Sequence, residues 1–116
     1  MANPNKAKGT RWESTVRDFL QEERCLDHAR RIAQTGTLDI GDIHMEPFAL
    51  QAKNQKAFDL AGWVSDAEVQ AERAGMTYGV AVVKAPRKPT DRGYVVMSLG
   101  TFRRLAAELI GGDVET

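Results

Sequence analysis

A chain of 116 residues with 42% apolar and 28% charged residues has the length and composition of one globular domain. The single cysteine, Cys25, excludes an internal disulfide framework and favours a reducing compartment, so we expect a cytoplasmic protein. No apolar run approaches a membrane span, and no signal peptide is predicted at Met1. The formal net charge is zero, so total charge gives no argument for a nucleic-acid partner.

The N-terminal part is predicted to form an arm followed by a helix. Residues 1–9 are polar and carry lysines, which is typical of a flexible basic arm. A helix is expected from Thr10 to about Glu23, because apolar residues recur there at helical spacing: Trp12, Val16, Phe19 and Leu20. Thr10 and Glu13 also have the spacing of a capping box. Glu13 is therefore either a helix cap or, if it points towards a sheet, a candidate metal ligand.

The next part of the chain is predicted to form strands. Residues 27–34 have weak strand character, and residues 39–53 form two short strands joined by a turn. In the second of these, apolar and polar residues alternate, so Gln51 and Lys53 project from the same side. Antiparallel pairing of the two strands would bring Asp42 close to that side. A carboxylate, an amide oxygen and an ammonium would then converge on one sheet surface.

Two aspartates compete for the carboxylate position. We prefer Asp42, because it is expected inside the strand and closer to Gln51. Asp39 is interpreted as a turn residue or as a group that supports the site from outside. His44 could contact DNA or metal, but a lone histidine on a short strand is more often structural.

The second half of the chain alternates helix and strand. A long helix is predicted from Asp59 to Ala74 and is stopped by Gly75. The strand at Thr77 to Val83 is apolar on both faces and should lie in the interior of the sheet. The remaining elements are a basic loop at 85–92, a strand at 94–97, a helix from Ser98 or Thr101 to Ile110, and a tail at 111–116.

Asp42, followed nine residues later by Gln51-x-Lys53, resembles the core motif of the PD-(D/E)xK nuclease superfamily, with glutamine in the acidic position. Lys8-Gly9 followed by Glu13 is similar to the opening of the small Holliday-junction resolvases of that superfamily. The closest resemblance is to the small resolvase-like nucleases of bacteriophages. It covers about residues 6–105, and the order of predicted elements is consistent with it.

The resemblance implies an α/β fold in a single domain over residues 10–110. This fold has a restriction-endonuclease-like core, a central mixed sheet of about five strands flanked by helices. The implied activity is that of a Mg²⁺-dependent endonuclease that hydrolyses phosphodiester bonds in branched DNA such as four-way junctions. A homodimer is also implied, since two matched cuts suit a two-fold substrate. A phage-encoded protein of this kind would act in the host cytoplasm.

The resemblance also implies roles for individual residues. The metal ligands would be Glu13, Asp42, the Gln51 amide oxygen and the Ala52 carbonyl, and Lys53 would orient the attacking water or contact the phosphate. Mg²⁺ prefers hard oxygen ligands, and Mn²⁺ could replace it. Gln51 departs from the family pattern, and a neutral amide binds a divalent cation more weakly than a carboxylate does.

Basic residues outside the motif are candidate DNA contacts, although scattered solvated charges would have the same composition. The candidates are Lys6, Lys8, Arg11, Lys56, Arg87 and Lys88. Two other functions remain open. The first alternative is a catalytically weak or inactive, structure-specific DNA-binding protein with the same fold. The second is a small interaction protein without a nucleic-acid role.

Overall fold

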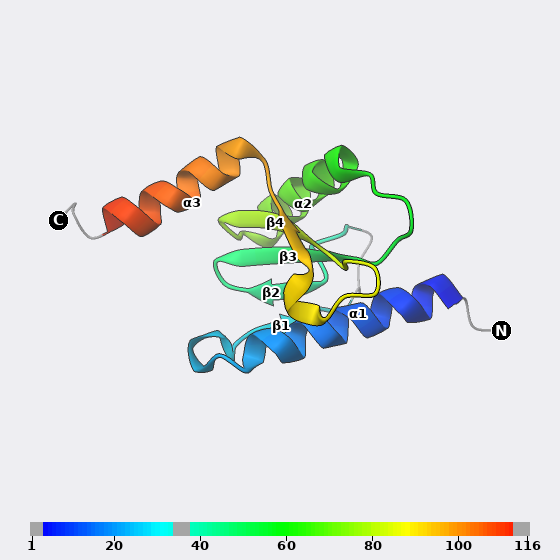
Figure 1. The fold of residues 1–116 in the computed structure, drawn as a ribbon. Coiled ribbons are helices and arrows are strands. Elements are labelled where there is room, and N and C mark those ends of the chain that lie inside the picture. Colours follow the sequence, from blue (N-terminus) through cyan, green and yellow to red (C-terminus); the bar gives the residue numbers. More distant parts are fainter. Residues whose placement is uncertain (1–3, 34–37, 113–116) are drawn as a thin grey trace.

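The computed structural model describes residues 4–33 and 38–112 and confirms an α/β fold with a mixed five-stranded sheet (Figure 1). The strands lie in the sheet in chain order. β3 and β4 are parallel, and the other neighbours are antiparallel. The strands are β1 (Arg30–Arg31), β2 (Ile43–Met45), β3 (Phe48–Lys53), β4 (Tyr78–Val83) and β5 (Tyr94–Val96).

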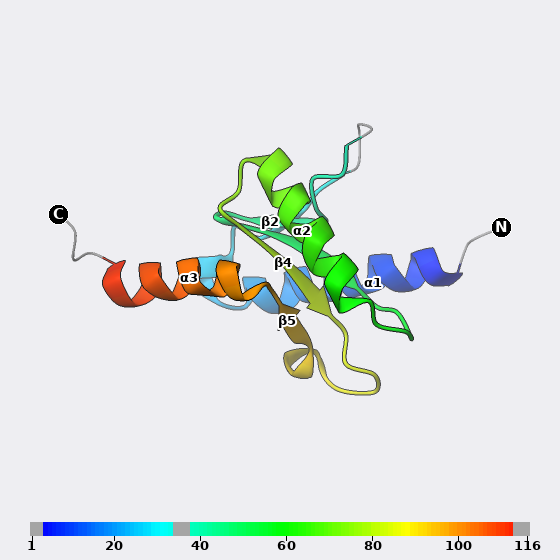
Figure 2. The ribbon, with the colours of Figure 1, turned by 90° about the horizontal axis from the view of Figure 1, so that it is seen from above.

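Two helices cover opposite faces of the sheet, and a third projects from it (Figures 1 and 2). These helices are α1 (Pro4–Gln21), α2 (Leu60–Ala74) and α3 (Leu99–Gly111). Short 3-10 helices, η1 (Arg24–Leu26) and η2 (Thr90–Arg92), lie in the connections. α1 packs Trp12 and Val16 into the larger apolar cluster, whereas α2 packs Trp63 against β4. The core therefore has two parts, one on each side of the sheet.

The elements around β3 have the bounds that their sequences favour. All six residues of β4 are buried, as expected for a strand that is apolar on both faces. The Asp59 side chain accepts a hydrogen bond from the Gly62 N–H at 3.1 Å and caps the start of α2. Gly75 ends that helix with a φ of 71°, a left-handed conformation that favours glycine. The prediction of a helix from Asp59 to Ala74 is confirmed to within one residue.

The N-terminal prediction needs correction. α1 begins at Pro4, so residues 4–9 are helical and do not form a flexible arm. Proline suits the first helical turn, because its φ is already fixed and its missing N–H would have no partner there. Thr10 and Glu13 therefore lie inside the helix, and the capping box predicted for them is wrong. Phe19, expected in the buried stripe, is 41% exposed.

The strand predicted at 27–34 is much shorter than expected. Only Arg30 and Arg31 pair with β2, and residues 34–37 lie outside the described residues. The chain before β1 instead turns through η1, which places an exposed Cys25 at the surface. The short β1 is an edge strand of the sheet, and it lies next to α1.

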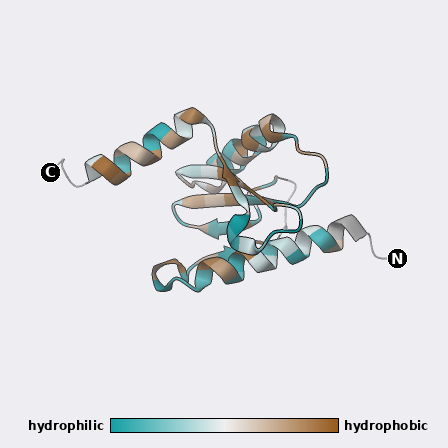
Figure 3. Ribbon diagram, in the orientation of Figure 1, coloured by the Kyte–Doolittle hydropathy of each residue, from teal (hydrophilic) through white to brown (hydrophobic). Residues whose placement is uncertain are grey.

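α3 is formed as predicted, but its apolar face is not buried. The Ser98 hydroxyl accepts from the Thr101 N–H at 3.0 Å and caps the helix. The Tyr78 hydroxyl donates to the Glu108 carboxylate and ties α3 to β4. Leu109 and Ile110 are nevertheless 81% and 84% exposed, and Figure 3 shows these apolar segments on a helix that stands away from the sheet. Within the described ranges, no helix combines the length and apolar character needed to cross a membrane.

Candidate active site and basic groove

Asp42 lies opposite Gln51, at the point where β2 begins alongside β3. The register pairs Ile43 with Leu50. Asp42, which precedes Ile43, therefore faces Gln51, which follows Leu50. The Asp42 N–H donates to the Leu50 carbonyl at 2.9 Å, and the Ala52 N–H donates to Asp42 Oδ2 at 2.8 Å. The predicted antiparallel pairing is thus confirmed. Asp42 itself comes one residue before the strand instead of inside it.

The surroundings of Asp42 favour its protonated form. The pKa of this carboxyl group is raised from 3.8 to about 6, mainly by burial and also by the nearby charges of Glu13 and Asp39. The hydrogen bond from Ala52 and the charge of Lys53 oppose this shift. An ionised Asp42 is therefore held at a free-energy cost, which a bound cation would reduce.

Gln51 and Ala52 supply further oxygen atoms beside Asp42. Gln51 is only 6% exposed, and its Oε1 has no hydrogen-bond partner among the described residues. The Ala52 N–H points towards Asp42, and the N–H and C=O of one strand residue point to the same strand edge. The Ala52 carbonyl is therefore directed to the side on which Asp42 lies. Both groups are hard oxygen donors.

Lys53 is positioned by an aromatic ring. Its Nζ lies 6.0 Å from the centre of the Trp63 ring, which belongs to α2. Gln51 and Lys53 both face α2, as the alternation of β3 predicts, while Leu50 and Ala52 belong to the apolar cluster under α1. In the described part of the chain, Lys53 makes no ion pair. Its ammonium group is therefore available to a water molecule or a phosphate.

Glu13 points across to the sheet rather than to its own helix start. Its Oε1 accepts from Arg31 of β1, with the Arg31 Nη2 at 3.2 Å. Its charge nevertheless acts on Asp42, as the raised pKa of Asp42 indicates. This orientation excludes the capping role, and the role of Glu13 as a metal ligand stays a prediction. Arg31 would have to share or release Glu13 for direct metal binding.

The segment before Asp42 is held by its own contacts. Asp39 Oδ1 accepts from the Gly41 N–H at 3.0 Å, which forms a local turn. Gly41 has a φ of 101°, a backbone conformation that side chains rarely allow. His44 is buried and its Nε2 donates to the Ile40 carbonyl at 2.7 Å, consistent with the structural role preferred for it. Asp39 likewise behaves as a turn residue beside the site.

The oxygen atoms of the site are ligands of the kind that a hard divalent cation prefers, but few of them are charged. Among residues 4–33 and 38–112, no group of three or more His, Cys, Asp or Glu side chains is arranged to hold a metal ion. The amide and carbonyl oxygens of Gln51 and Ala52 add to the carboxylate of Asp42. Mg²⁺ keeps several water ligands and needs few protein groups. A buried amide oxygen without a hydrogen-bond partner, next to a carboxyl group whose pKa is raised by burial, is compatible with a hydrated cation of this kind.

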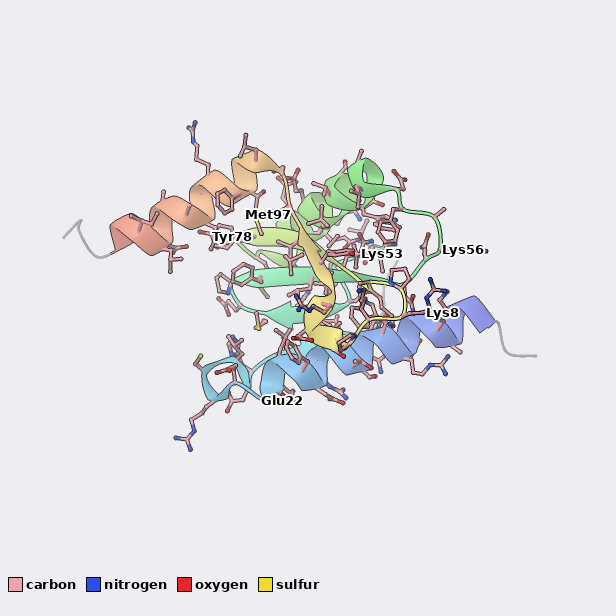
Figure 4. The ribbon with its side chains drawn as sticks, in the orientation of Figure 1. Lys8, Glu22, Lys53, Lys56, Tyr78 and Met97 are labelled. Atoms are coloured by element: carbon pink, nitrogen blue, oxygen red, sulfur yellow. The ribbon has the colours of Figure 1, made fainter. Side chains whose placement is uncertain are left out.

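A groove of about 600 Å³ adjoins Lys53 at the carboxyl end of β3. Lys8 from α1 and Lys56 from the connection after β3 line it together with Lys53 and with neighbouring residues of that connection. Figure 4 shows the three lysines at the same end of the molecule. The structure therefore brings together two of the predicted DNA contacts and the motif lysine.

The other predicted DNA contacts are placed less specifically. Arg11, Arg87 and Lys88 are exposed but do not line this groove. The loop that carries Arg87 and Lys88 leaves the sheet at the same end, since β3 and β4 are parallel (Figures 1 and 2). The side chain of Lys6 lies outside the described residues.

From the sequence, Gln70 of α2 could help to hold DNA or a site water, but most helical glutamines are solvated. It is only 4% exposed, and its Nε2 donates to Asp39 Oδ2 at 2.9 Å. A signal was present in the sequence, because Gln70 falls in the apolar stripe of α2 that contains Trp63, Ala67 and Ala71. A glutamine at such a position is buried and requires hydrogen-bond partners.

Comparison of the chain with family models, with curated proteins and with solved structures finds no match in any of the three. A function is therefore inferred from the residues of the site and from the groove beside it.

Proposed function

We propose that the protein is a metal-dependent endodeoxyribonuclease of the PD-(D/E)xK type that hydrolyses phosphodiester bonds in branched DNA. The observation that carries this proposal is the position of Asp42 opposite Gln51, with Lys53 two residues further on the same face of β3. The groove lined by Lys8, Lys53 and Lys56 supports a phosphate-bearing substrate, because clustered lysines neutralise backbone phosphates. Such an enzyme acts on DNA in the cytoplasm.

In this proposal each residue has a defined task. Asp42, Gln51 and the Ala52 carbonyl would hold Mg²⁺ or Mn²⁺, with Glu13 as a further carboxylate. When bound, the cation lowers the pKa of a water molecule and neutralises charge on the phosphoryl oxygens. Lys53 orients the attacking water or contacts the scissile phosphate. The Trp63 ring limits where its ammonium group can lie.

The direct test is cleavage of a synthetic four-way junction and of its linear arms, with Mg²⁺, with Mn²⁺ and with EDTA. We expect cleavage of the junction with either metal and more cleavage with Mn²⁺ than with Mg²⁺. We expect no cleavage in EDTA. Asp42→Asn should lower the cleavage rate by about 100-fold or more, because it removes the main charged ligand. Metal-independent cutting, or full activity of a folded Asp42→Asn protein, would contradict the proposal.

A second candidate function is a structure-specific DNA-binding protein that cuts weakly or not at all. The observation in its favour is that Gln51 replaces a carboxylate, while the Glu13 carboxylate is engaged by Arg31. This candidate predicts tight binding of the four-way junction in EDTA and no cleavage at any metal concentration. Absence of junction binding would exclude both candidates.

We also propose that the protein forms a homodimer through α3. The exposed apolar side chains there are those of Leu99, Phe102, Leu109 and Ile110. A two-fold pair of α3 helices would bury these apolar side chains of one copy against the same side chains of the other. Light scattering should give a dimer for the native chain and a monomer for Leu109→Glu.

A further inference from the structure

The second buried glutamine of the site belongs to α2. Gln70 is almost completely buried, and its Nε2 donates to Asp39 Oδ2 at 2.9 Å. Its Oε1 has no hydrogen-bond partner among the described residues. The same holds for Oε1 of Gln51, which faces α2 from β3. Two unpartnered amide oxygens therefore lie on the two layers that enclose the site.

Gln70 acts on the segment that carries the metal-binding carboxylate. Asp39 is held by Gln70 and by the Gly41 N–H, and its backbone carbonyl accepts from Arg73 Nη1 at 3.3 Å. The charge of Asp39 raises the pKa of Asp42, so the two carboxylates are close enough to interact. α2 thus fixes the approach to Asp42 through Gln70 and Arg73.

A purely structural role does not account for the amide oxygen of Gln70. A buried acceptor without a partner destabilises the fold, and an apolar side chain of similar length would avoid that cost. Its neighbours in the stripe of α2 are Ala67 and Ala71, which place no polar side chain beside it. The water ligands of a divalent cation, in contrast, are strong hydrogen-bond donors that require acceptors around them.

We propose that Gln70 is a positioning residue of the cation site: its Nε2 holds Asp39, and its Oε1 accepts hydrogen bonds from the water ligands of a divalent cation that Asp42 and Gln51 would hold. This inference rests on the proposed metal-dependent function and extends it to α2. Its ligand is a hydrated divalent cation, so affinity depends on the outer amide oxygen of Gln70 as well as on the direct ligands.

The test measures Mn²⁺ binding to the full chain without DNA, and electron paramagnetic resonance reports the concentration of free Mn²⁺ during the titration. Gln70→Met removes both amide atoms and keeps the length of the side chain. Gln70→Glu keeps an acceptor but removes the donor to Asp39. Gln21→Met is the matched control, because Gln21 is an exposed glutamine at the end of α1 whose Nε2 donates only to the Ala29 carbonyl, outside the site and the groove. Unfolding by denaturant in EDTA gives the stability of each variant separately.

Gln70→Met should weaken Mn²⁺ binding by about 10-fold, the lower end of the loss expected when outer hydrogen bonds to a metal site are removed. Gln70→Glu keeps the acceptor and should weaken binding less than Gln70→Met does, and Gln21→Met should be unchanged. A merely structural Gln70 would alter the unfolding curve without altering Mn²⁺ affinity. Equal affinity of Gln70→Met and the native chain would overturn the inference, as would equally weakened binding by both Gln70 variants.

The outcome also separates this inference from the proposed function. If the native chain binds Mn²⁺ and Asp42→Asn does not, the cation site stands, and an unchanged Gln70→Met then overturns only the role of Gln70. If the native chain binds no Mn²⁺, both proposals are wrong. Should Gln70→Met fail to fold, Asp39→Ala replaces it, since alanine removes the acceptor of the Gln70 Nε2 hydrogen bond. Unchanged Mn²⁺ affinity of Asp39→Ala would contradict the involvement of the Gln70–Asp39 pair.

Discussion

The two faces of β3 bury different kinds of side chain. Towards α1, Leu50 and Ala52 pack into an apolar cluster with Trp12. Towards α2, Gln51 is buried with an unpartnered amide oxygen, and Lys53 lies over an aromatic ring. Burial stabilises the first face and costs free energy on the second. One strand therefore carries both the core and the site, and the apolar face offsets the cost of the polar one.

Neighbouring residues of β3 should respond in opposite ways when their side chains are changed. Leu50→Ala removes a buried apolar side chain and should lower the free energy of unfolding by about 2–5 kcal/mol. Gln51→Met replaces the orphaned amide by an apolar group and should raise it by about 1 kcal/mol. Urea unfolding in EDTA measures both. A destabilised Gln51→Met would mean that the amide oxygen has a partner in solution.

The raised pKa of Asp42 should make the stability of the protein depend on pH. The folded protein binds the Asp42 proton more tightly than the unfolded chain does, because the pKa is about 6 instead of 3.8. The favourable contribution of the protonated group is complete below about pH 4 and is lost as the pH rises through 6. Asp42→Asn should therefore stabilise the protein at pH 8 by up to about 3 kcal/mol relative to its effect at pH 4.

Unfolding curves of the native chain and Asp42→Asn, recorded in EDTA at several pH values, measure this difference. Asn can still accept the hydrogen bond from Ala52, so the comparison isolates the charge. Adding Mn²⁺ should reduce the advantage of Asp42→Asn, because a cation that binds only the folded native chain stabilises it. A difference that stays constant from pH 4 to pH 8 would show that the Asp42 carboxyl is not held in a buried, acidic environment.

Local sequence signals were sufficient for most of the fold. The alternation of residues 48–53 gives β3, and Asp59 and Gly75 mark both ends of α2 because caps depend on local chemistry. The prediction for the N-terminal residues was wrong because local signals there were misleading. The polar run after Pro4 and the spacing of Thr10 and Glu13 imitate a loop followed by a helix start, although the helix simply continues through them.

The site could be predicted only where it lies on one pair of strands. Pairing along β3 follows from the alternation of residues, and so do the positions of Asp42, Gln51 and Lys53. The contact of Gln70 with Asp39 joins residues 31 positions apart and depends on how α2 packs on the sheet. Likewise, the exposure of the apolar face of α3 could not be read from its periodicity, because a helical stripe does not say which surface will cover it.

An acidic residue at position 51 should strengthen cation binding at the polar face of β3. Gln51→Glu adds one negative charge beside Asp42 and should tighten Mg²⁺ binding by about 1 kcal/mol or more, if the charge acts at about 4 Å in partly screened surroundings. The measurement is a metal titration and not the maximal rate, since the new carboxylate could also pair with Lys53. Equal half-saturation for the native chain and Gln51→Glu would mean that residue 51 does not face the cation.

The smallest expected effect concerns the groove beside this face. Lys56 is exposed and lines the groove with Lys8 and Lys53, so Lys56→Ala should weaken junction binding equally for different sequences. If Lys56 contacts one phosphate, its loss should reduce the slope of log K against log salt concentration by about 0.9. Arg24→Ala is the control, because Arg24 is an exposed cation of η1 that does not line the groove. Binding is measured in EDTA at several salt concentrations, which prevents metal-dependent cleavage from entering the result. If both variants changed the slope equally, DNA would be attracted by the charge of the whole surface, and the groove would have no special part in its recognition.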